Sequence, residues 1–141
     1  QRGDAAKGGV VFEQNCRACH AFGVQGGGAI GPDLAVVKDR TAPYLVTHIL
    51  DPNRAVENRY MMYSATLLDG RSLAGMLVAE AGNSITLRGL DGAEHVILRN
   101  EVRLLVSSGR SLMPEGLEAA ITPAAMADLV AYLAGDVRAA K

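Results

Sequence analysis

The sequence has few aromatic residues and few cysteines, and each shortage limits what the chain can be. It contains no tryptophan, and aromatic residues make up only 4% of its 141 residues, so aliphatic side chains and methionine must build most of a core. A flat apolar cofactor would compensate for the missing rings. Only two cysteines are present, which excludes a scaffold of several disulfides. Hydrophobic residues nevertheless account for 49% of the chain, enough to bury a core.

The sequence also lacks a long hydrophobic run and an excess of one charge. No apolar stretch approaches the roughly 20 residues that a membrane span requires, and the first nine residues, QRGDAAKGG, lack the apolar core of a signal peptide. We therefore expect a soluble chain without a membrane span, either a mature product or an excised domain. The 14 basic and 15 acidic residues form no long run, so we expect no binding to nucleic acid or to an anionic membrane surface.

Three segments have hydrophobic patterns that predict helices. They are residues 4–19, 42–50 and 122–133. Asp4 can cap the first, and Leu45 and Ile49 share one face of the second. Thr122 followed by Pro123 is a favoured start for the third.

The third predicted helix carries one apolar stripe that must pack against another element. The stripe consists of residues at the spacing i, i+3, i+4 and i+7: Met126, Leu129, Val130 and Leu133. In the first helix, Gly8 allows close approach of a backbone and Phe12 follows one turn later. We therefore expect the two terminal helices to cross at Gly8.

Between residues 60 and 106 the pattern changes to short segments rich in β-branched and aliphatic residues. The segments are 60–68, 71–79, 84–90, 93–98 and 101–106, separated by turns such as Asp69-Gly70 and Asp91-Gly92. They predict an antiparallel meander, whose alternation is clearest at Val102, Leu104 and Val106. Because the terminal helices are expected to need each other, we expect an insertion at about 60–106 within one domain, residues 1–141. The fold class is therefore mainly α with an inserted antiparallel β-meander, α+β overall.

Residues 16–20 form a complete CxxCH, the attachment pattern of haem c. On a helix, Cys16, Cys19 and His20 fall on one face at i, i+3 and i+4. The two thiols can then add to the two vinyl groups of a haem while the imidazole reaches the iron. The spacing predicts one covalent haem c with His20 as an axial ligand.

Two other uses of paired cysteines fit the sequence less well. A thioredoxin-like CxxC lies at a helix start after a strand, whereas this motif is predicted at a helix end before a glycine-rich loop. A zinc site needs four ligands, and the other histidines, His48 and His95, have no ligand spacing to the motif. Haem is therefore the favoured interpretation.

The glycine-rich loop formally matches the dinucleotide-binding pattern GxGxxG over residues 26–31. That pattern holds a pyrophosphate only between a strand and a helix N-terminus. Here the CxxCH precedes it and Pro32 follows, so we interpret the match as accidental. An iron-bound His20 would donate its other ring nitrogen to an acceptor, and the carbonyl of Pro32 is our candidate; a turn proline is the alternative.

The sixth iron ligand decides the type of function, because a filled position favours electron transfer and an open one favours ligand binding or catalysis. Five methionines compete for it. Four are expected to pack in cores: Met126 on the helix stripe, and Met61, Met62 and Met76 in strand segments. Met113 lies outside regular structure before Pro114, which stiffens the backbone, and it is our preferred ligand. His48 and His95 are the remaining candidates.

Taken together, these features resemble class I c-type cytochromes. The resemblance rests on the helix before the CxxCH, the Gly-Pro-Asp-Leu sequence at 31–34, Met113-Pro114 and the C-terminal helix, which span nearly the whole chain. More narrowly, the inserted strands and the sequence SLMPEGL at 111–117 look like those of planctomycete-type haem-binding domains. Those domains often form the C-terminal part of larger secreted proteins.

The resemblance implies a cytochrome c fold with His20 and Met113 as axial ligands and the Pro32 carbonyl as the partner of His20. It also implies transfer to the periplasm before haem attachment. Compact class I cytochromes lack the strand insertion, so their propionate contacts cannot be carried over. Arg59 and Tyr60, entering the first strand, are our candidates for that role.

The function expected from these residues is one-electron transfer by a single low-spin haem, in a carrier that is not itself an enzyme. The partner would be a redox protein or a fused dehydrogenase domain in the periplasm or another extracytoplasmic space. Two alternatives stay open. One is a ligand-binding or catalytic haem domain with an open or displaceable sixth ligand, and the other is a partner-docking module that uses the β insertion.

Overall fold

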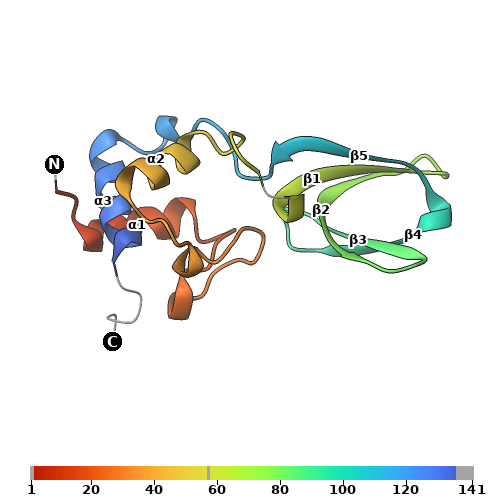
Figure 1. Ribbon diagram of the computed structural model, residues 1–141, viewed down its shortest axis with the longest axis horizontal. Helices are drawn as coiled ribbons and strands as arrows, with labels where there is room; N and C mark the ends of the chain where they lie inside the picture. The colour runs from red at the N-terminus through yellow and green to blue at the C-terminus, as the bar shows by residue number, and fades with distance from the viewer. Residues whose placement is uncertain (1, 57, 136–141) are drawn as a thin grey trace. The chain divides into compact units, whose positions relative to one another are not determined.

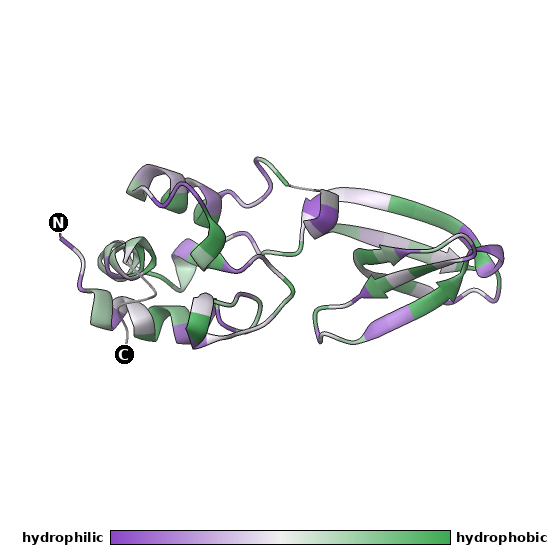
Figure 2. Ribbon diagram, turned by 60° about the horizontal axis from the view of Figure 1, so that its bottom comes forward, coloured by the Kyte–Doolittle hydropathy of each residue, from purple (hydrophilic) through white to green (hydrophobic). Residues whose placement is uncertain are grey.

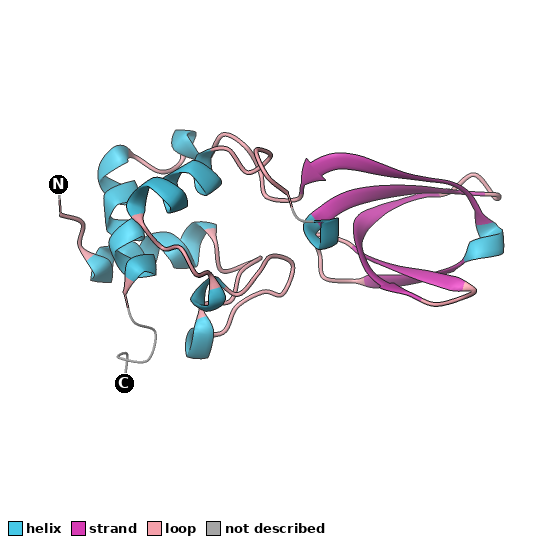
Figure 3. Ribbon diagram, viewed as in Figure 1, coloured by secondary structure: helices cyan, strands magenta, loops and turns pink. Residues whose placement is uncertain are grey.

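The computed structural model describes residues 2–56 and 58–135 (Figure 1). The chain divides into two compact units, one formed by Gln1–Pro52 with Pro114–Lys141 and the other by Asn53–Met113. All three α-helices belong to the first unit and all five described strands to the second (Figure 3). We call them the helical unit and the sheet unit. The chain passes between them twice, after Pro52 and after Met113.

The helical unit contains α1 (Ala5–Asn15), α2 (Ala42–Leu50) and α3 (Pro123–Ala134). The predicted starts are confirmed: the Asp4 carboxylate accepts from the first-turn amides of α1, and Thr122 Oγ1 accepts from the Ala125 amide of α3. These bonds satisfy backbone donors that a helix start leaves unpaired. The predicted bounds of α2 are confirmed as well, with Leu45 and Ile49 buried.

The first helix ends earlier than the sequence predicts, at Asn15 instead of residue 19. Two successive amides, those of Cys16 and Arg17, donate to the carbonyl of Phe12 at 2.8 and 3.0 Å. The second of these bonds closes a wider turn than the i to i−4 pattern of an α-helix. The CxxCH therefore follows α1 and is not part of it.

The predicted crossing of α1 and α3 at Gly8 is confirmed. A Cβ at position 8 would lie 2.0 Å from the carbonyl oxygen of Asp128, so the two backbones are too close for any side chain there. The ring of Phe12, 1% exposed, contacts the rings of Phe22 and Tyr132 at centroid distances of 5.9 and 5.7 Å. Three of the stripe residues of α3 are buried: Met126, Leu129 and Leu133.

The sheet unit contains five antiparallel strands. They are β1 (Met61–Leu67), β2 (Ser72–Glu80), β3 (Ser84–Arg88), β4 (Glu94–Leu98) and β5 (Val102–Ser111). Their order in the sheet is β4-β3-β2-β1-β5, so the first four form the predicted meander. The fifth strand departs from it, because β5 pairs with β1 and not with β4 (Figure 1).

The short connection from β4 to β5 shows how the chain reaches the opposite edge of the sheet. It is a 3₁₀ helix, η4 (Arg99–Glu101), tied to both neighbouring turns. The Arg99 amide donates to the Asn83 carbonyl at 2.8 Å, and the Leu68 amide donates to the Glu101 carbonyl at 2.9 Å. The sheet must therefore curl to bring its two edges to the ends of a three-residue connection.

One face of the curled sheet encloses a buried aliphatic core. Its members come from β1, β3 and β4: Ala65, Leu67, Ile85, Leu87 and Ile97. Hydrophilic and hydrophobic residues alternate along β3, and the sheet carries positions of both kinds (Figure 2), as expected where successive side chains point to opposite faces.

The alternation predicted for β5 is wrong. The register shifts between Leu67, which pairs with Val102, and Thr66, which pairs with Leu104. This bulge places Val102 and Leu105 against the core, while Leu104 is 56% exposed. An extra residue in one strand reverses which side chains face inward beyond it.

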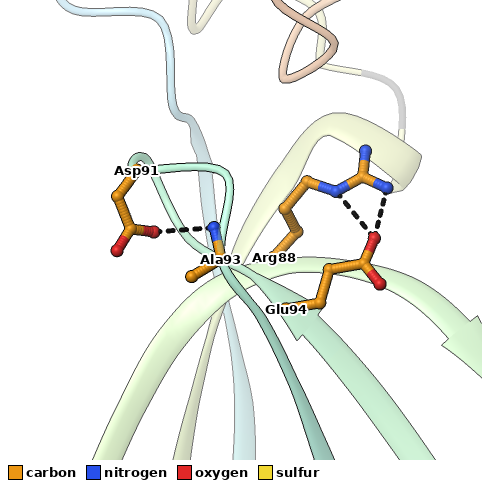
Figure 4. Close-up of polar contacts among 4 residues, drawn as sticks. All are labelled: Arg88, Asp91, Ala93 and Glu94. Carbon is orange, nitrogen blue, oxygen red and sulfur yellow. Dashed lines mark hydrogen bonds and ion pairs between the residues drawn. The ribbon is translucent and has the colours of Figure 1, made fainter.

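Polar contacts close the turn between β3 and β4 (Figure 4). The Asp91 carboxylate accepts from the Ala93 amide at 2.9 Å. Across the strands, the Arg88 guanidinium reaches one oxygen of the Glu94 carboxylate through two nitrogens, at 3.1 and 2.5 Å. Because Arg88 and Glu94 are paired in the register, this contact supports the alignment of the hairpin.

The sequence predicts a mainly α fold, but helices do not predominate in the structure. The three α-helices have 11, 9 and 12 residues, whereas the strands have between 5 and 10 residues each and form a complete sheet of their own. The chain is mixed α+β. Within its described residues, the helices are all too short or too polar to cross a membrane.

Candidate functional site

The CxxCH forms a hydrogen-bonded turn directly after α1. The amides of Cys19 and His20 both donate to the carbonyl of Cys16, at 3.1 and 2.9 Å. The turn thus keeps a helical i, i+3, i+4 spacing for the two thiols and the imidazole, although α1 has ended. Both cysteines are free and partly exposed, so both sulfurs are available for covalent attachment.

The imidazole of His20 is held by the loop that follows it. Its Nδ1 lies 2.8 Å from the carbonyl oxygen of Pro32, so Nδ1 carries the proton and donates. Nε2 is then the nitrogen with a lone pair for a metal. A Cβ at position 31 would lie 2.4 Å from Cε1 of His20, which explains why glycine precedes Pro32.

Two other loop glycines, Gly27 and Gly28, pack on the backbone of the CxxCH itself. A Cβ at Gly27 would lie 2.1 Å from the His20 carbonyl oxygen, and one at Gly28 would lie 2.0 Å from that of Ala18. The Gly28 amide also donates to the Arg17 carbonyl at 2.8 Å. These glycines support the turn, and neither a strand before them nor an α-helix directly after them is found among the described residues. The structure therefore favours the accidental interpretation of GxGxxG.

Asp33 is a loop anchor that sequence reasoning missed. Its Oδ1 accepts from the amides of Gly23 and Ala35, both at 2.9 Å, so one carboxylate joins the two ends of the loop. The Leu34 amide donates to the Ala21 carbonyl at 2.9 Å. The only signal in the sequence is an aspartate after Gly-Pro, which is common in ordinary turns.

Burial sets the protonation of the site. It lowers the pKa of His20, an effect that the hydrogen bond to Pro32 opposes in part. Burial, together with the neighbouring Cys19, raises the pKa of Cys16 to about 11. At neutral pH the site therefore presents a neutral imidazole and a protonated Cys16 thiol, the forms that ligate iron and add to a vinyl group.

The donors fit haem better than a bare metal ion. Two thiols and one oriented imidazole follow one another within a single turn, which matches two vinyl groups and one axial position. In the part of the chain that the structure describes, no group of three or more His, Cys, Asp or Glu residues comes together to hold a metal ion. The zinc interpretation is therefore disfavoured.

The remaining predicted site residues belong to the sheet unit. Arg59 and Tyr60 lie in η3 (Asn58–Tyr60), where the guanidinium lies 4.9 Å from the centroid of the Tyr60 ring. Met113 is partly buried just beyond β5, and its amide donates to Ser111 Oγ at 3.1 Å. The structure thus brings Cys16, Cys19, His20 and Pro32 together in one unit and places Met113, Arg59 and Tyr60 in the other.

Several competing ligands have other contacts. Met76 and Met126 are 2% and 7% exposed in their cores, and Met61 Sδ accepts from Ser107 Oγ at 3.1 Å. The ring of His48, in the last turn of α2, contacts Tyr44 at a centroid distance of 4.2 Å. His95 is an exposed residue of β4.

Comparison with known proteins finds similarity to cytochromes over part of the chain. Residues 3–67 match the family model described as "Cytochrome C oxidase, cbb3-type, subunit III". A protein from Synechocystis sp. named "Cytochrome c-553-like" is 40% identical over 47 residues, which are 33% of this chain and 43% of that protein. The chain thus matches less than half the length of this relative.

The family match contains the CxxCH and Pro32 but ends before Met113. It therefore bears on haem attachment and not on the sixth ligand. Together with the geometry of the CxxCH turn, the comparisons show that the chain is similar to class I c-type cytochromes, whose cofactor is a covalently bound haem c.

Proposed function

We propose that this chain is a monohaem electron carrier in which Cys16 and Cys19 hold the haem through thioether bonds and His20 is an axial ligand. One observation carries the proposal. The imidazole that follows the two thiols is fixed through Nδ1 by the Pro32 carbonyl at 2.8 Å, which leaves Nε2 for iron. A bound haem c supplies the reversible ferric–ferrous change, and no bond in a substrate needs to form or break.

The residues of the turn keep the haem and its ligand in place while the iron is oxidised and reduced. Two covalent bonds keep the haem from dissociating, and the loop from Gly27 to Pro32 restricts the imidazole to one orientation. Because the ligand does not have to reorient when the oxidation state changes, little reorganisation accompanies electron transfer.

Met113 is our proposed second axial ligand. Three observations support it: Met113 lies outside helices and strands, its backbone is tethered by Ser111, and Pro114 follows it. Met61, Met76 and Met126 are engaged in packing or hydrogen bonding. A thioether and an imidazole would give a low-spin iron, and methionine ligation raises the potential.

Arg59 and Tyr60 are our proposal for contacts to the propionates. Arg59 is exposed and stacked on the Tyr60 ring. A guanidinium and a phenol are suitable donors to a carboxylate.

The electron partner is proposed to be a redox protein or a dehydrogenase domain of the same polypeptide, in the periplasm or another extracytoplasmic space. Haem c attachment takes place outside the cytoplasm in the families that the chain resembles. Arg17, paired with Glu13 and reaching the Gln25 carbonyl, lies within the CxxCH and would border the haem edge. The sheet unit between α2 and α3 supports the narrower assignment to the planctomycete-type domains.

Two measurements test haem attachment. Protein matured in a host competent for cytochrome c assembly should have the intact mass of the chain plus one haem, and its pyridine haemochrome spectrum should be that of a haem with two thioether bonds. Replacing Cys16 and Cys19 by serine should abolish both signals. Colourless wild-type protein, with its cysteines free or joined to each other, would refute the proposal.

A far-red charge-transfer band in the ferric spectrum tests methionine ligation. We expect the band in the wild type, its loss in Met113→Leu and its retention in Met61→Leu. Both substitutions conserve side-chain volume, so loss of the band in Met113→Leu alone would identify the ligand. A high-spin wild type that binds carbon monoxide rapidly would instead favour a ligand-binding haem domain.

A further inference from the structure

Ser111 joins three separate parts of the sheet unit. It is the last residue of β5 and pairs with Met61, the first residue of β1. Its amide donates to the side-chain oxygen of Asn53 at 2.8 Å, and its own Oγ accepts from the Met113 amide at 3.1 Å. All three positions are partly buried, so water competes less for these bonds than on an open surface.

The bond between Asn53 and Ser111 links the two places where the chain passes between the units. Asn53 is the first residue of the sheet unit and Met113 is its last. They are 60 positions apart in the sequence, yet Ser111 contacts both through hydrogen bonds. The backbone of Met113 is therefore fixed to the end of the β1–β5 ladder and to the entering chain at once.

We propose that Ser111, held by Asn53, is a positioning residue that sets how firmly Met113 binds the iron. This inference rests on the proposed ligation by Met113. A ligand on a loop must lose conformational freedom when it binds a metal, and a backbone that is already ordered loses less. The Ser111 hydrogen bond orders the residue that carries the thioether before it binds.

In this proposal the function of the sheet unit is to position the methionine that binds the haem iron. Strand β5 ends at Ser111, two residues before Met113, and its pairing with β1 anchors this serine. The hydrogen bond to Ser111 therefore ties the backbone of Met113 to the sheet. Sites supported in this way hold their geometry better than sites on unsupported loops.

Imidazole added to the ferric protein measures the effect, because it competes with Met113 for the iron. When the native ligand is held less firmly, the apparent affinity for the competitor rises by the same factor. We expect Ser111→Ala to bind imidazole roughly three- to tenfold more tightly than the wild type, the range for loss of one hydrogen bond. Its far-red band should weaken while the thioether-bound haem is retained.

Ser108 offers a matched control on the same strand. Its Oγ accepts from the amide two residues later, Arg110, at the same 3.1 Å, and also bonds the Met62 carbonyl. Ser108→Ala therefore loses equivalent bonds that do not lead to Met113, and its imidazole affinity should equal that of the wild type. Ser111→Thr keeps the hydroxyl and should restore wild-type affinity. Asn53→Ala should tighten imidazole binding in the same direction as Ser111→Ala.

The outcomes separate the inference from the function on which it rests. If Ser111→Ala lowers the melting temperature but binds imidazole as Ser108→Ala does, Ser111 is merely structural and the inference is overturned. If Met113→Leu leaves the far-red band and imidazole affinity of the wild type unchanged, the proposed ligand itself is wrong and the inference fails with it. If Ser111→Ala does not fold, the imidazole affinities of Ser111→Thr and Ser111→Val are compared instead. These two side chains have the same shape, and only threonine keeps the acceptor oxygen.

Discussion

Gly31 and His20 are so close that no other residue type fits beside this imidazole. A Cβ at position 31 would lie 2.4 Å from Cε1 and 2.7 Å from Nδ1 of the ring. The same ring nitrogen bonds the carbonyl of the next residue, Pro32. The glycine therefore acts on the orientation of the proposed iron ligand from outside the ligand set.

We expect Gly31→Ala to disturb haem attachment. The added methyl must displace the imidazole or the Pro32 carbonyl, because it cannot share their space. The ratio of haem to protein after maturation should fall, and the ferric spectrum should show a mixture of spin states. Gly82→Ala is the control, since a Cβ at Gly82 meets nothing within 4 Å. Full haem content with an unchanged spectrum in Gly31→Ala would contradict this account.

Two neighbouring glycines of α1 should respond to alanine to very different extents. At Gly8 the methyl would meet the backbone of α3 at 2.0 Å, whereas at Gly9 it would lie 3.3 Å from a ring carbon of Tyr132, which can move. Gly8→Ala should lower the free energy of unfolding by about 3 kcal/mol. Gly9→Ala should change it by about 1 kcal/mol or less, because better helix propensity offsets the tighter contact. Guanidinium titrations followed by circular dichroism compare the two, and equal losses would disprove the close crossing at Gly8.

The Asp33 carboxylate should determine the order of the loop. Asp33→Ala removes the acceptor of two hydrogen bonds from backbone amides, which we expect to lower the stability of the loop by about 1–3 kcal/mol. Asp33→Asn keeps an oxygen in the same place. Hydrogen exchange at the amides of Gly23 and Ala35 measures the effect directly. Exchange should accelerate in the alanine variant and stay slow in the asparagine variant. Slow exchange in both would show that other contacts order the loop.

The core of the sheet unit should be sensitive to loss of volume. Leu87 is 0% exposed in β3, whereas Val96 on the adjacent strand is 72% exposed. We expect Leu87→Ala to destabilise the sheet unit by about 2–5 kcal/mol and Val96→Ala by about 0.5 kcal/mol or less. Thermal unfolding monitored at strand amides tests this, and a similar loss for both would contradict the core assignment.

The sequence predicts local structure well where one signal acts alone. Thr122 and Pro123 mark the start of α3, and Gly8 marks the helix crossing, because each depends on nearby residues or on a single steric requirement. The end of α1 is missed because apolar spacing continues through the CxxCH. The shared acceptor at Phe12, which is set by the folded turn, is what ends the helix.

Long-range pairing is where prediction from sequence fails. No local pattern indicates that β5 pairs with β1, and the two strands begin 41 positions apart, at Met61 and Val102. No local pattern indicates the bulge between Val102 and Leu104 either. The roles of Asp33 and Ser111 escape prediction for the same reason. Each residue type is common in turns, and only the folded chain brings Asn53 to Ser111.

The sheet unit interrupts the helical unit in the sequence, and this has a consequence for biosynthesis. The strands occupy one continuous segment, so a nascent chain can complete their pairing as soon as Ser111 has left the ribosome. The helices α1 and α3 pack together only after the whole of that segment has been translated. Contacts between distant residues form slowly. During synthesis α1, which leads into the CxxCH, therefore stays without its partner helix α3 until the whole sheet segment has been translated.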